Sequence, residues 1–381
     1  MKKICFVTTI SSTLKAFVLK TAEYIHENTD WNISFICDYD EEFEKSLPSY
    51  IHYIPVKMER GISFAGVKAM LEMRNIFIRE KFDLIQYSTP NASLYAAIAG
   101  KLAKVPVRLY CQWGMVYISF SGIKRKIFKL IEKTVCRLST HIQPDSKSNL
   151  NFSHNEGLYA QNKGSVIWNG SACGVNLEKF DVSKKEKYRN EIRAKHNLSS
   201  DDFVFGFVGR ITRDKGVNEL LEAYKQIVKE NKNTYLMIVG NTEMDGTIQN
   251  DLYEWAQACE NIAFTGYTTE VEKYLAAMDT YILPSYREGF GMGVVEAEAM
   301  GVPVIVTDIP GPIDAMVDGV TGKVIPPKNV MALKEAMNDM IHNQDDIEAY
   351  GKAAIKHATE NFEQKQFLEK VLLDRKNLLN K

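Results

Sequence analysis

YILPSYREGFGMGVVEAEAMG, residues 281–301, predicts a β-strand, a glycine-rich turn and an α-helix in direct succession. The strand covers Tyr281–Leu283 and ends at Pro284, because proline has no N–H to donate to a neighbouring strand. The helix starts near Met292, and Gly301 with the proline that follows ends it. The first backbone N–H groups of a helix have no partner inside it, and the helix dipole adds partial positive charge there. The stretch therefore predicts a seat for an anion, most often a phosphate.

Two carboxylates bracket this seat, Glu288 in the turn and Glu296 inside the helix, with seven residues between them. A carboxylate repels a phosphate but accepts hydrogen bonds from hydroxyl groups, so a sugar is its more sensible partner. A phosphate seat between two hydroxyl acceptors indicates a nucleotide sugar. The alternative is an ordinary strand–helix unit with two exposed acids, because single motifs produce false positives.

The same segment resembles the signature of the retaining family-4 glycosyltransferases, which have the GT-B fold. In that signature two glutamates seven residues apart precede an A-x-G-x-P-V strand, here Ala299–Val304. Three further segments match the family in order: Phe207–Gly216 (FVGRITRDKG), Phe264–Gly266 and Gly311–Gly322. Together the matches cover most of residues 200–330. The resemblance implies an α/β protein of two Rossmann-like, doubly wound parallel-sheet domains that face a central cleft.

The length of 381 residues also favours two domains. Strands that alternate with helices along the chain predict parallel sheets covered on both faces. We expect an acceptor-binding domain over 1–180, a nucleotide-sugar-binding domain over 181–360, and a C-terminal helix over 361–381 that crosses back to the first domain. Residues 170–200 are interpreted as the linker, and Ser165–Trp168 as a short strand before it.

Composition excludes several other classes of protein. Hydrophobic residues make up 45% and charged residues 25%, which predicts a packed soluble core, and the net charge of −1 argues against a nucleic-acid partner. The six cysteines are scattered without a CxxC pair, so neither a zinc site nor a disulfide framework is indicated. The N-terminus reads as a strand rather than a signal peptide, and no run of eighteen apolar residues occurs. We therefore expect a cytoplasmic protein.

Arg210 and Lys215 are the candidate catalytic cations. They flank a loop directly after the predicted strand Val204–Val208, at the carboxyl end where open α/β sheets bind ligands. Preplaced positive groups stabilise the charge that grows on the phosphate when a glycosidic bond breaks; two solvated surface cations are the alternative. The resemblance implies that Glu288 holds the hydroxyls of the donor sugar and Glu296 those of the ribose. The remaining donor-binding residues expected from the matching segments are Gly209, Tyr267 beside the base, Gly289, Phe290, Gly291, Met292 and Gly293.

Asp38-Tyr-Asp40 is a D-x-D sequence, which binds the metal in glycosyltransferases of the other main fold. Here it lies in the acidic stretch CDYDEEFEK, so a solvated loop is the simpler interpretation. The resemblance implies metal-independent catalysis with retention of the anomeric configuration. We therefore expect no metal and no cofactor besides the nucleotide-sugar donor, which is most readily UDP-linked.

The acceptor is expected on the first domain. Ser11 and Ser12 lie in a predicted polar turn, Thr9–Thr13, after the first strand, where many relatives have a glycine pair; a helix N-cap is the alternative. The family often has a histidine that lines the acceptor side of the donor sugar, and Trp113 occupies the matching position here. Trp113 could stack on a sugar or be buried.

A basic amphipathic helix beside the aromatic stretch Trp113–Ser121 predicts contact with an anionic membrane surface. A core helix with a solvated basic face is the alternative. Because the chain resembles enzymes that extend lipid-linked saccharides, we expect a peripheral protein on the inner face of the plasma membrane. The cations assigned to this surface are Lys124, Arg125, Lys126 and Lys129.

The expected function is a retaining glycosyltransferase that moves a hexose or N-acetylhexosamine from a nucleotide sugar to a lipid-linked saccharide acceptor in surface polysaccharide or glycan biosynthesis. A GT-B sugar-nucleotide 2-epimerase is a second reading, although no set of acids or histidines marks the strand ends of the first domain. A dinucleotide-binding oxidoreductase would need G-x-G-x-x-G rather than Gly289-x-Gly291-x-Gly293. A non-catalytic nucleotide-sugar-binding partner protein remains open if Trp113 has replaced an essential histidine.

Overall fold

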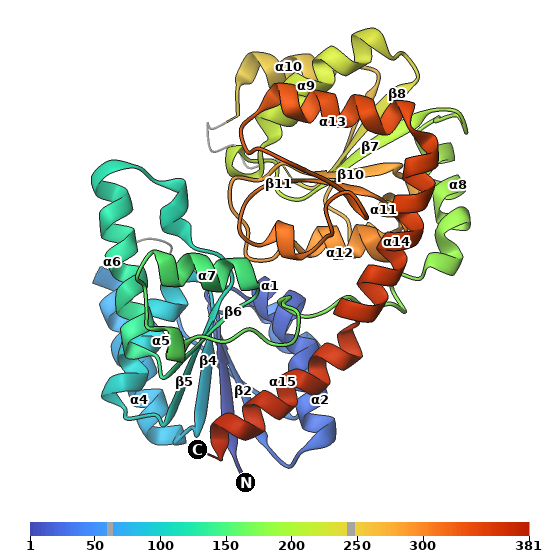
Figure 1. Cartoon of the computed structure of the whole chain (residues 1–381). Helices are drawn as coiled ribbons and strands as arrows, with labels where there is room; N and C mark the ends of the chain where they lie inside the picture. The colour runs from blue at the N-terminus through green and yellow to red at the C-terminus, as the bar shows by residue number, and fades with distance from the viewer. Residues whose placement is uncertain (59–63, 242–247, 381) are drawn as a thin grey trace. The chain divides into compact units, whose positions relative to one another are not determined.

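The computed structural model describes residues 1–58, 64–241 and 248–380. The chain divides into two units (Figure 1), of which the first comprises Met1–Cys173 and Lys365–Lys381 and the second comprises Gly174–Gln364. Each unit is built on one six-stranded sheet, and every strand pair in both sheets is parallel. Two doubly wound α/β units confirm the expected fold class.

The first sheet has the strand order β3-β2-β1-β4-β5-β6. Residues of β1 alternate between two apolar layers, with Cys5 and Val7 in one and Ile4 and Phe6 in the other. The strand order reverses between β1 and β4, and open α/β sheets bind their ligands at the carboxyl ends of such strands. The strands are β1 (Lys3–Val7), β2 (Asn32–Cys37), β3 (Ile51–Pro55), β4 (Leu84–Tyr87), β5 (Val107–Gln112) and β6 (His141–Pro144).

Helices cover both faces of the first sheet (Figure 1). The layer that contains Cys5 and Val7 packs against α4 (Phe64–Glu80), α5 (Pro90–Leu102) and α6 (Gly122–Leu138). The opposite layer packs against α2 (Leu19–Asn28) and α15 (Gln364–Leu379). Shorter helices follow strand ends: α1 (Ser11–Thr13), the π-helix η1 (Leu14–Val18), α3 (Glu41–Ser46), the 3-10 helix η2 (Val116–Ser119) and α7 (Lys147–Asn155).

A buried arginine fixes the C-terminal helix α15 to the first unit. Arg375 is 2% exposed, and its guanidinium donates to Gln86 of β4 at 3.1 Å and to Gln143 of β6 at 2.7 Å. Its neighbour Asp374 supplies the counter-charge. Because a buried cation without partners is costly, this set of contacts ties the helix to two strands of the first sheet.

The second sheet has the strand order β12-β11-β10-β7-β8-β9, and its order reverses between β7 and β10. One apolar layer contains α8 (Lys185–Lys195), α11 (Val271–Ala277), α12 (Met292–Ala299) and α14 (Gln344–Phe362). The other contains α9 (Val217–Glu230), α10 (Asn250–Ala258) and α13 (Val330–His342). The strands are β7 (Phe203–Val208), β8 (Thr234–Val239), β9 (Ile262–Gly266), β10 (Thr280–Leu283), β11 (Val304–Thr307) and β12 (Gly322–Ile325).

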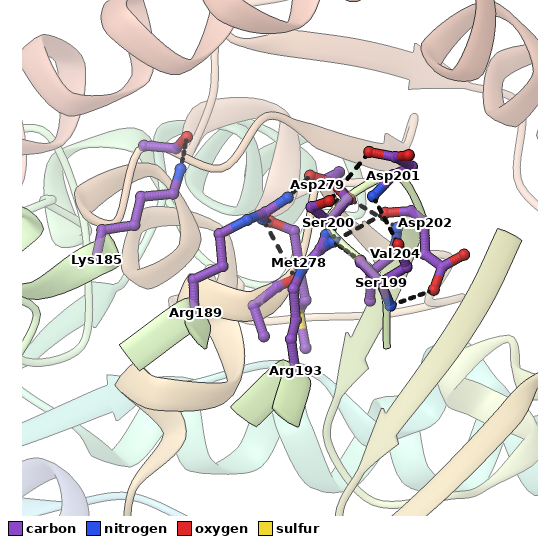
Figure 2. Close-up of polar contacts among 12 residues, drawn as sticks. Lys185, Arg189, Arg193, Ser199, Ser200, Asp201, Asp202, Val204, Met278 and Asp279 are labelled. Atoms are coloured by element: carbon purple, nitrogen blue, oxygen red, sulfur yellow. Dashed lines mark hydrogen bonds and ion pairs between the residues drawn. The ribbon is translucent and has the colours of Figure 1, made fainter. Parts of the chain in front are cut away.

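The sequence predicted a linker over residues 170–200. In the structure, residues 174–200 are instead part of the second unit. Arg189 and Arg193 of α8 both donate to Asp279, at 2.6 and 2.7 Å (Figure 2). Asp279 also accepts from the backbone N–H of Val204 at 2.7 Å, so α8 is joined to the start of β7. Arg193 is only 4% exposed and donates to further backbone carbonyls of the α8–β7 connection. This buried network holds the segment in place.

Two local predictions were wrong. No strand forms at Ser165–Trp168, because Trp168 has a φ of 50°, which extended backbone does not adopt; an isolated bridge between Ile142 and Gly164 is the pairing found there. The predicted polar turn Thr9–Thr13 is helical from Ser11 onward. The N-cap of that helix is Ile10, so neither Ser11 nor Ser12 serves as the cap.

Candidate active site

The loops that carry the predicted catalytic residues follow β7 and β10, the two strands at which the order of the second sheet reverses. We call residues 209–216 the β7 loop and residues 284–291 the β10 loop. Because parallel strands place their carboxyl ends at the same edge, the two loops meet. Gly216 marks the closest approach: its φ is 72°, and a Cβ added to it would lie 2.0 Å from the carbonyl oxygen of Pro284.

Lys215 and Glu288 are brought into direct contact. Lys215 Nζ lies 2.5 Å from Glu288 Oε1, and 21% and 13% of the two side chains are exposed. The hydroxyl of Ser285 donates to the same carboxylate oxygen at 2.7 Å. Thr307, at the end of β11, in turn donates to the carbonyl oxygen of Ser285 at 2.6 Å. The carboxylate is therefore held in position by a lysine and by a hydroxyl that is itself anchored to the next strand.

Arg210 is exposed and lies next to Gly209, at the point where the β7 loop leaves the sheet. The N–H of Gly209 donates to Val239 at 2.9 Å, which continues the β7–β8 ladder by one residue. Burial raises the pKa of Asp214, but the hydrogen bond from Thr212 and the charges of Arg287, Arg210 and Lys215 together hold it below its usual value. Both predicted cations thus lower the pKa of the same carboxyl group, that of Asp214 in the β7 loop.

The predicted anion seat is the N-terminus of α12. Gly291 is its N-cap, with a φ of 92°, and the helix begins at the partly exposed Met292. The side chain of Phe290 is 2% exposed and packs on Phe362, so only its backbone can face a ligand. Gly311 allows the backbone of Gly289 to come close, since a Cβ on Gly311 would lie 2.6 Å from the carbonyl oxygen of Gly289. The glycines therefore shape the backbone around the start of the helix.

Gly293 has a packing role in addition to any contact with a donor. A Cβ at this position would lie 2.4 Å from the hydroxyl oxygen of Tyr281 in β10. Tyr281 is fully buried, so its side chain has no room to move aside. The glycine allows α12 to lie directly on the strand before it.

Glu296 lies on α12 with part of its side chain exposed. Burial raises the pKa of Glu296 to about 7; the charge of Lys179 lowers it, and that of Glu272 raises it further. Tyr267, expected beside the base, follows β9 and is 72% exposed. Its backbone N–H donates to Asn241, which follows β8, at 3.1 Å. Tyr267 therefore presents its ring at the carboxyl edge of the second sheet.

In the first unit, the predicted acceptor-side serines lie at the reversal of strand order between β1 and β4. Ser11 donates to Asp40 at 2.5 Å, whereas Ser12 is exposed. Asp40 also caps α3 through the N–H of Phe43, so this acid of the D-x-D sequence has a structural role. Among residues 1–58, 64–241 and 248–380, no three histidine, cysteine or acidic side chains gather in a way that could hold a metal ion.

Trp113 follows β5 and is partly buried. The centroid of its ring lies 5.5 Å from that of Phe17, a residue of η1, and both rings pack against the same apolar cluster. The preceding residue, Gln112, is fully buried, donating to Glu132 at 2.6 Å and accepting from Ser153 at 2.9 Å. Trp113 is therefore positioned by a rigid strand end and packs against Phe17.

The basic helix α6 carries an exposed apolar stripe as well as its charges. Ile123, Ile127 and Leu130 are 77%, 48% and 65% exposed and lie three and four residues apart, on one side of the helix. Arg125 and Lys129, however, both form ion pairs with Glu156, at 3.1 and 2.6 Å. Two of the four cations assigned to a membrane surface are thus engaged within the unit. Across the described ranges, no helix is both long and apolar enough to span a membrane.

Sequence reasoning missed the residues that support this site: Asp214, Ser285, Arg287 and Thr307. Arg287 Nη2 lies 2.8 Å from Asp214 Oδ2, next to the Lys215–Glu288 pair. Ser285 and Thr307 have no charge, and Ser285 lies within the quoted stretch without matching a named signature position. The signal that could have found them is topology, since all four residues lie at the ends of three neighbouring strands.

Two doubly wound parallel sheets, with a cation–carboxylate pair at the reversal point of the second, define a GT-B glycosyltransferase. The family models agree: "Glycosyl transferase 4-like" matches residues 3–146 and "Glycosyl transferases group 1" matches residues 188–357. The chain belongs to the family-4 glycosyltransferases of GT-B fold.

Relatives match over most of the chain. The capsular polysaccharide biosynthesis glycosyltransferase CapM of Staphylococcus aureus is 28% identical over 95% of this chain and 93% of its own. A UDP-Gal:alpha-D-GlcNAc-diphosphoundecaprenol alpha-1,3-galactosyltransferase of Escherichia coli is 27% identical over 74% of this chain and 73% of its own. The crystal structure of Anabaena HepE in complex with UDP and glucose shares the fold, with a TM-score of 0.79, 18% identity and coverage of 99% and 100%.

Proposed function

We propose that this glycosyltransferase transfers a hexose or N-acetylhexosamine from a UDP-sugar to a lipid-linked saccharide during surface polysaccharide synthesis. The observation that carries the proposal is the contact between Lys215 and Glu288 at the β7–β10 reversal point. It joins a cation suited to phosphate and a carboxylate suited to sugar hydroxyls, so a sugar diphosphate satisfies both. The HepE complex with UDP supports the nucleotide, and the diphosphoundecaprenol in the name of the Escherichia coli relative supports the acceptor.

In the proposed reaction, the bond between the anomeric carbon and the diphosphate oxygen breaks, and the electron pair leaves with UDP. Arg210, Lys215 and the N-terminus of α12 stabilise the negative charge that grows on the phosphate nearest the sugar. The acceptor hydroxyl attacks the anomeric carbon from the face that the phosphate leaves, and its proton passes to the departing phosphate oxygen. The new bond therefore keeps the anomeric configuration. Positive side chains perform the role that a metal has in other glycosyltransferases, so the proposed reaction needs no metal ion.

Glu288 and Glu296 bind different hydroxyl groups of the donor. Glu288 is fixed by Ser285 and Lys215, and holds the hydroxyls of the transferred sugar. Glu296 lies further along α12 and accepts from the ribose. Ribose hydroxyls donate most strongly to a carboxylate that is ionised, so nucleotide binding favours loss of the proton that Glu296 holds near neutral pH.

The first unit supplies the acceptor side and the membrane surface. Ser11, Ser12 and Trp113 line the acceptor path, and α6 rests on the anionic leaflet through Ile123, Ile127 and Leu130. The charges beside this apolar stripe are Lys124, Lys126, Lys133 and Arg137, whereas Arg125 and Lys129 are held by Glu156. A basic residue near an anionic leaflet contributes about 1 kcal/mol, which suits reversible binding close to a lipid-linked acceptor.

The donor is tested by a panel of UDP-, GDP- and ADP-sugars, with thermal unfolding and release of the nucleoside diphosphate as the two measurements. A ligand that binds only the folded chain raises its unfolding temperature. We expect UDP-sugars to do so, and at least one to be slowly hydrolysed or transferred. A preference for GDP- or ADP-sugars would contradict the UDP assignment, and no effect of any nucleotide sugar would contradict the proposed site.

A further inference from the structure

The β7 and β10 loops are joined by two adjacent ion pairs of opposite polarity. Asp214 faces Arg287 with 2.8 Å between Oδ2 and Nη2, and the next residues, Lys215 and Glu288, face each other at 2.5 Å. All four side chains are largely screened from solvent, with exposed fractions between 13% and 26%. Partial burial makes such pairs stronger and more dependent on geometry than surface ion pairs.

A backbone hydrogen bond also joins the two loops. The N–H of Tyr286 donates to the carbonyl oxygen of Asp214 at 2.9 Å. The hydroxyl of Thr212 holds the second carboxylate oxygen of Asp214 at 2.8 Å. The hydroxyl of Tyr286 forms a further hydrogen bond with Glu219 of α9. Asp214 therefore joins both loops through its main chain as well as its side chain.

The order of charges allows one set of partners between the loops. Asp214 and Lys215, in the 3-10 turn Arg213–Lys215, pair with Arg287 and Glu288 of the β10 loop. An exchange of partners would place Asp214 against Glu288 and Lys215 against Arg287. Such an exchange joins like charges in a partly buried place, and like charges at such distances repel.

A bound donor competes with the contact between Lys215 and Glu288, one of the two ion pairs. In the proposed function, on which this inference rests, Lys215 binds the diphosphate and Glu288 binds the sugar, so their mutual contact is shared with the substrate. Asp214 and Arg287 immediately precede Lys215 and Glu288 in their loops, and they pair with each other. Burial raises the pKa of Asp214, but Thr212 and Arg287 lower it more, so the carboxylate stays ionised at neutral pH.

We propose that Asp214 and Arg287 are positioning residues that fix the two loops against each other, and thereby the placement of Lys215 against the diphosphate while the donor is bound. They touch no reacting atom. Their effect is on the alignment of the catalytic groups, and misplacement by about 1 Å can cost a factor of ~100 in rate.

The test uses Asp214→Asn, Arg287→Gln, the double variant, and the charge exchange Asp214→Arg with Arg287→Asp. Each single variant should lower kcat with a UDP-sugar by about 10- to 100-fold and change KM by less than about 3-fold. The double variant should be no slower than the slower single variant, because both changes remove the same contact. Glu230→Gln and Lys334→Gln are matched controls. Each breaks a 2.8 Å ion pair that belongs to the same unit but lies outside these loops.

The charge exchange separates the order of the charges from simple pairing. It restores an ion pair, but Arg-Lys then faces Asp-Glu, so either cation can pair with either acid and the partners are no longer fixed. We expect the unfolding temperature to recover and kcat to stay low. Recovery of kcat in the exchanged protein would overturn the proposal that this order of charges positions the loops, and so would single variants that keep kcat within about twofold of the wild type.

A second measurement keeps the test independent of the proposed reaction. Hydrogen exchange at the Tyr286 amide reports the bond to Asp214 without any substrate. Exchange at Tyr286 should be faster in the single variants and the charge exchange, and unchanged in Glu230→Gln. Unchanged exchange in all of them would overturn the positioning role, whether or not the wild-type chain uses UDP-sugars. Absence of turnover in the wild type together with faster exchange in the variants would contradict the proposed function alone.

Discussion

Arg210 and Lys215 supply the positive charge of the proposed donor site. Replacing either with Ala should lower kcat by at least ~100-fold, comparable to the loss of one preplaced donor at a developing charge. Turnover at saturating UDP-sugar is the measurement, with Lys229→Ala, an exposed lysine on α9, as the matched control. Near-normal turnover in both variants would remove these residues from the mechanism.

Glu296 gives the protein a specific dependence of stability on pH. Burial raises its pKa to about 7, whereas an exposed glutamate in the unfolded chain titrates near ~4.3. Between these values the folded protein binds more protons than the unfolded chain, so the contribution of Glu296 to stability falls as pH rises through this window. Above about pH 7 both states are ionised at this residue, and the loss is complete.

Glu296→Gln removes that titration. The unfolding temperature of the variant, relative to wild type, should rise between about pH 4 and about pH 7 and then level off. Thermal unfolding measured across pH 4–8 in low-salt buffers provides the comparison. Parallel curves for the two proteins would show that the carboxyl of Glu296 is not perturbed.

For single residues, the sequence could not predict which side chains pair with one another. The signature motif located Lys215 and Glu288, because each lies beside a recognisable glycine turn. It gave no sign that Asp214 pairs with Arg287, since the two positions are 73 residues apart and either could be solvated. Likewise, Arg125 and Lys129 read as free cations on a basic helix, and only the fold reveals Glu156 opposite them.

Among the elements, α12 depends on a glycine where it crosses β10. Gly293→Ala should destabilise the protein by about 1–3 kcal/mol, because the added Cβ would lie 2.4 Å from the hydroxyl oxygen of Tyr281. That hydroxyl is buried and has no hydrogen-bond partner among the described residues, so Tyr281→Phe alone should be neutral or slightly stabilising.

In the Tyr281→Phe background, Gly293→Ala should cost less than about 1 kcal/mol, since the clash is relieved and alanine favours the helix. Denaturant unfolding of the four proteins in this cycle measures the coupling. Additive effects would mean that the hydroxyl and the added methyl group do not meet.

The exposed stripe of α6 predicts membrane binding. Replacing Lys124, Lys126 and Lys133 with Ser should release the protein from anionic liposomes, since each basic residue contributes about 1 kcal/mol near the leaflet. Sedimentation with liposomes at low and high salt is the measurement, and wild-type binding should weaken as salt screens the charges.

The control for this experiment replaces Lys20, Lys45 and Lys352, exposed lysines on other helices, and should sediment as wild type does. A wild-type protein that ignores anionic liposomes at low salt would show that the stripe is merely solvated. It would also remove the reason to expect a lipid-linked acceptor close to the first unit.

Periodic patterns located most of the elements, and their failures have identifiable causes. Short apolar runs do not distinguish a strand from an extended loop, and Ser165–Trp168 failed because Trp168 takes a left-handed conformation that no pattern signals. Thr9–Thr13 reads as a turn from its polar composition, yet tertiary packing of Leu14 and Val18 carries the helix back to Ser11. The segment 174–200 looked like a linker because it is highly charged, although Arg189 and Arg193 point to Asp279.

For the whole molecule, the regular alternation of strands and helices predicted parallel sheets covered on both faces, and the family resemblance implied that there are two of them and that both are doubly wound. The sequence also placed Lys215 and Glu288 on two loops that the structure brings into contact. The residues alone did not provide the reversal of strand order between β7 and β10, which brings those loops together; it was expected only through the family resemblance. That reversal depends on packing between segments far apart in the chain.

The central claim is tested by transfer from a UDP-sugar to a short saccharide on a polyprenyl diphosphate, in the presence of EDTA. The account predicts a lengthened lipid-linked product whose new bond has the same anomeric configuration as the donor, as measured by NMR coupling across that bond, and loss of this product in Lys215→Ala. An inverted product, or activity that EDTA abolishes and magnesium or manganese restores, would contradict it.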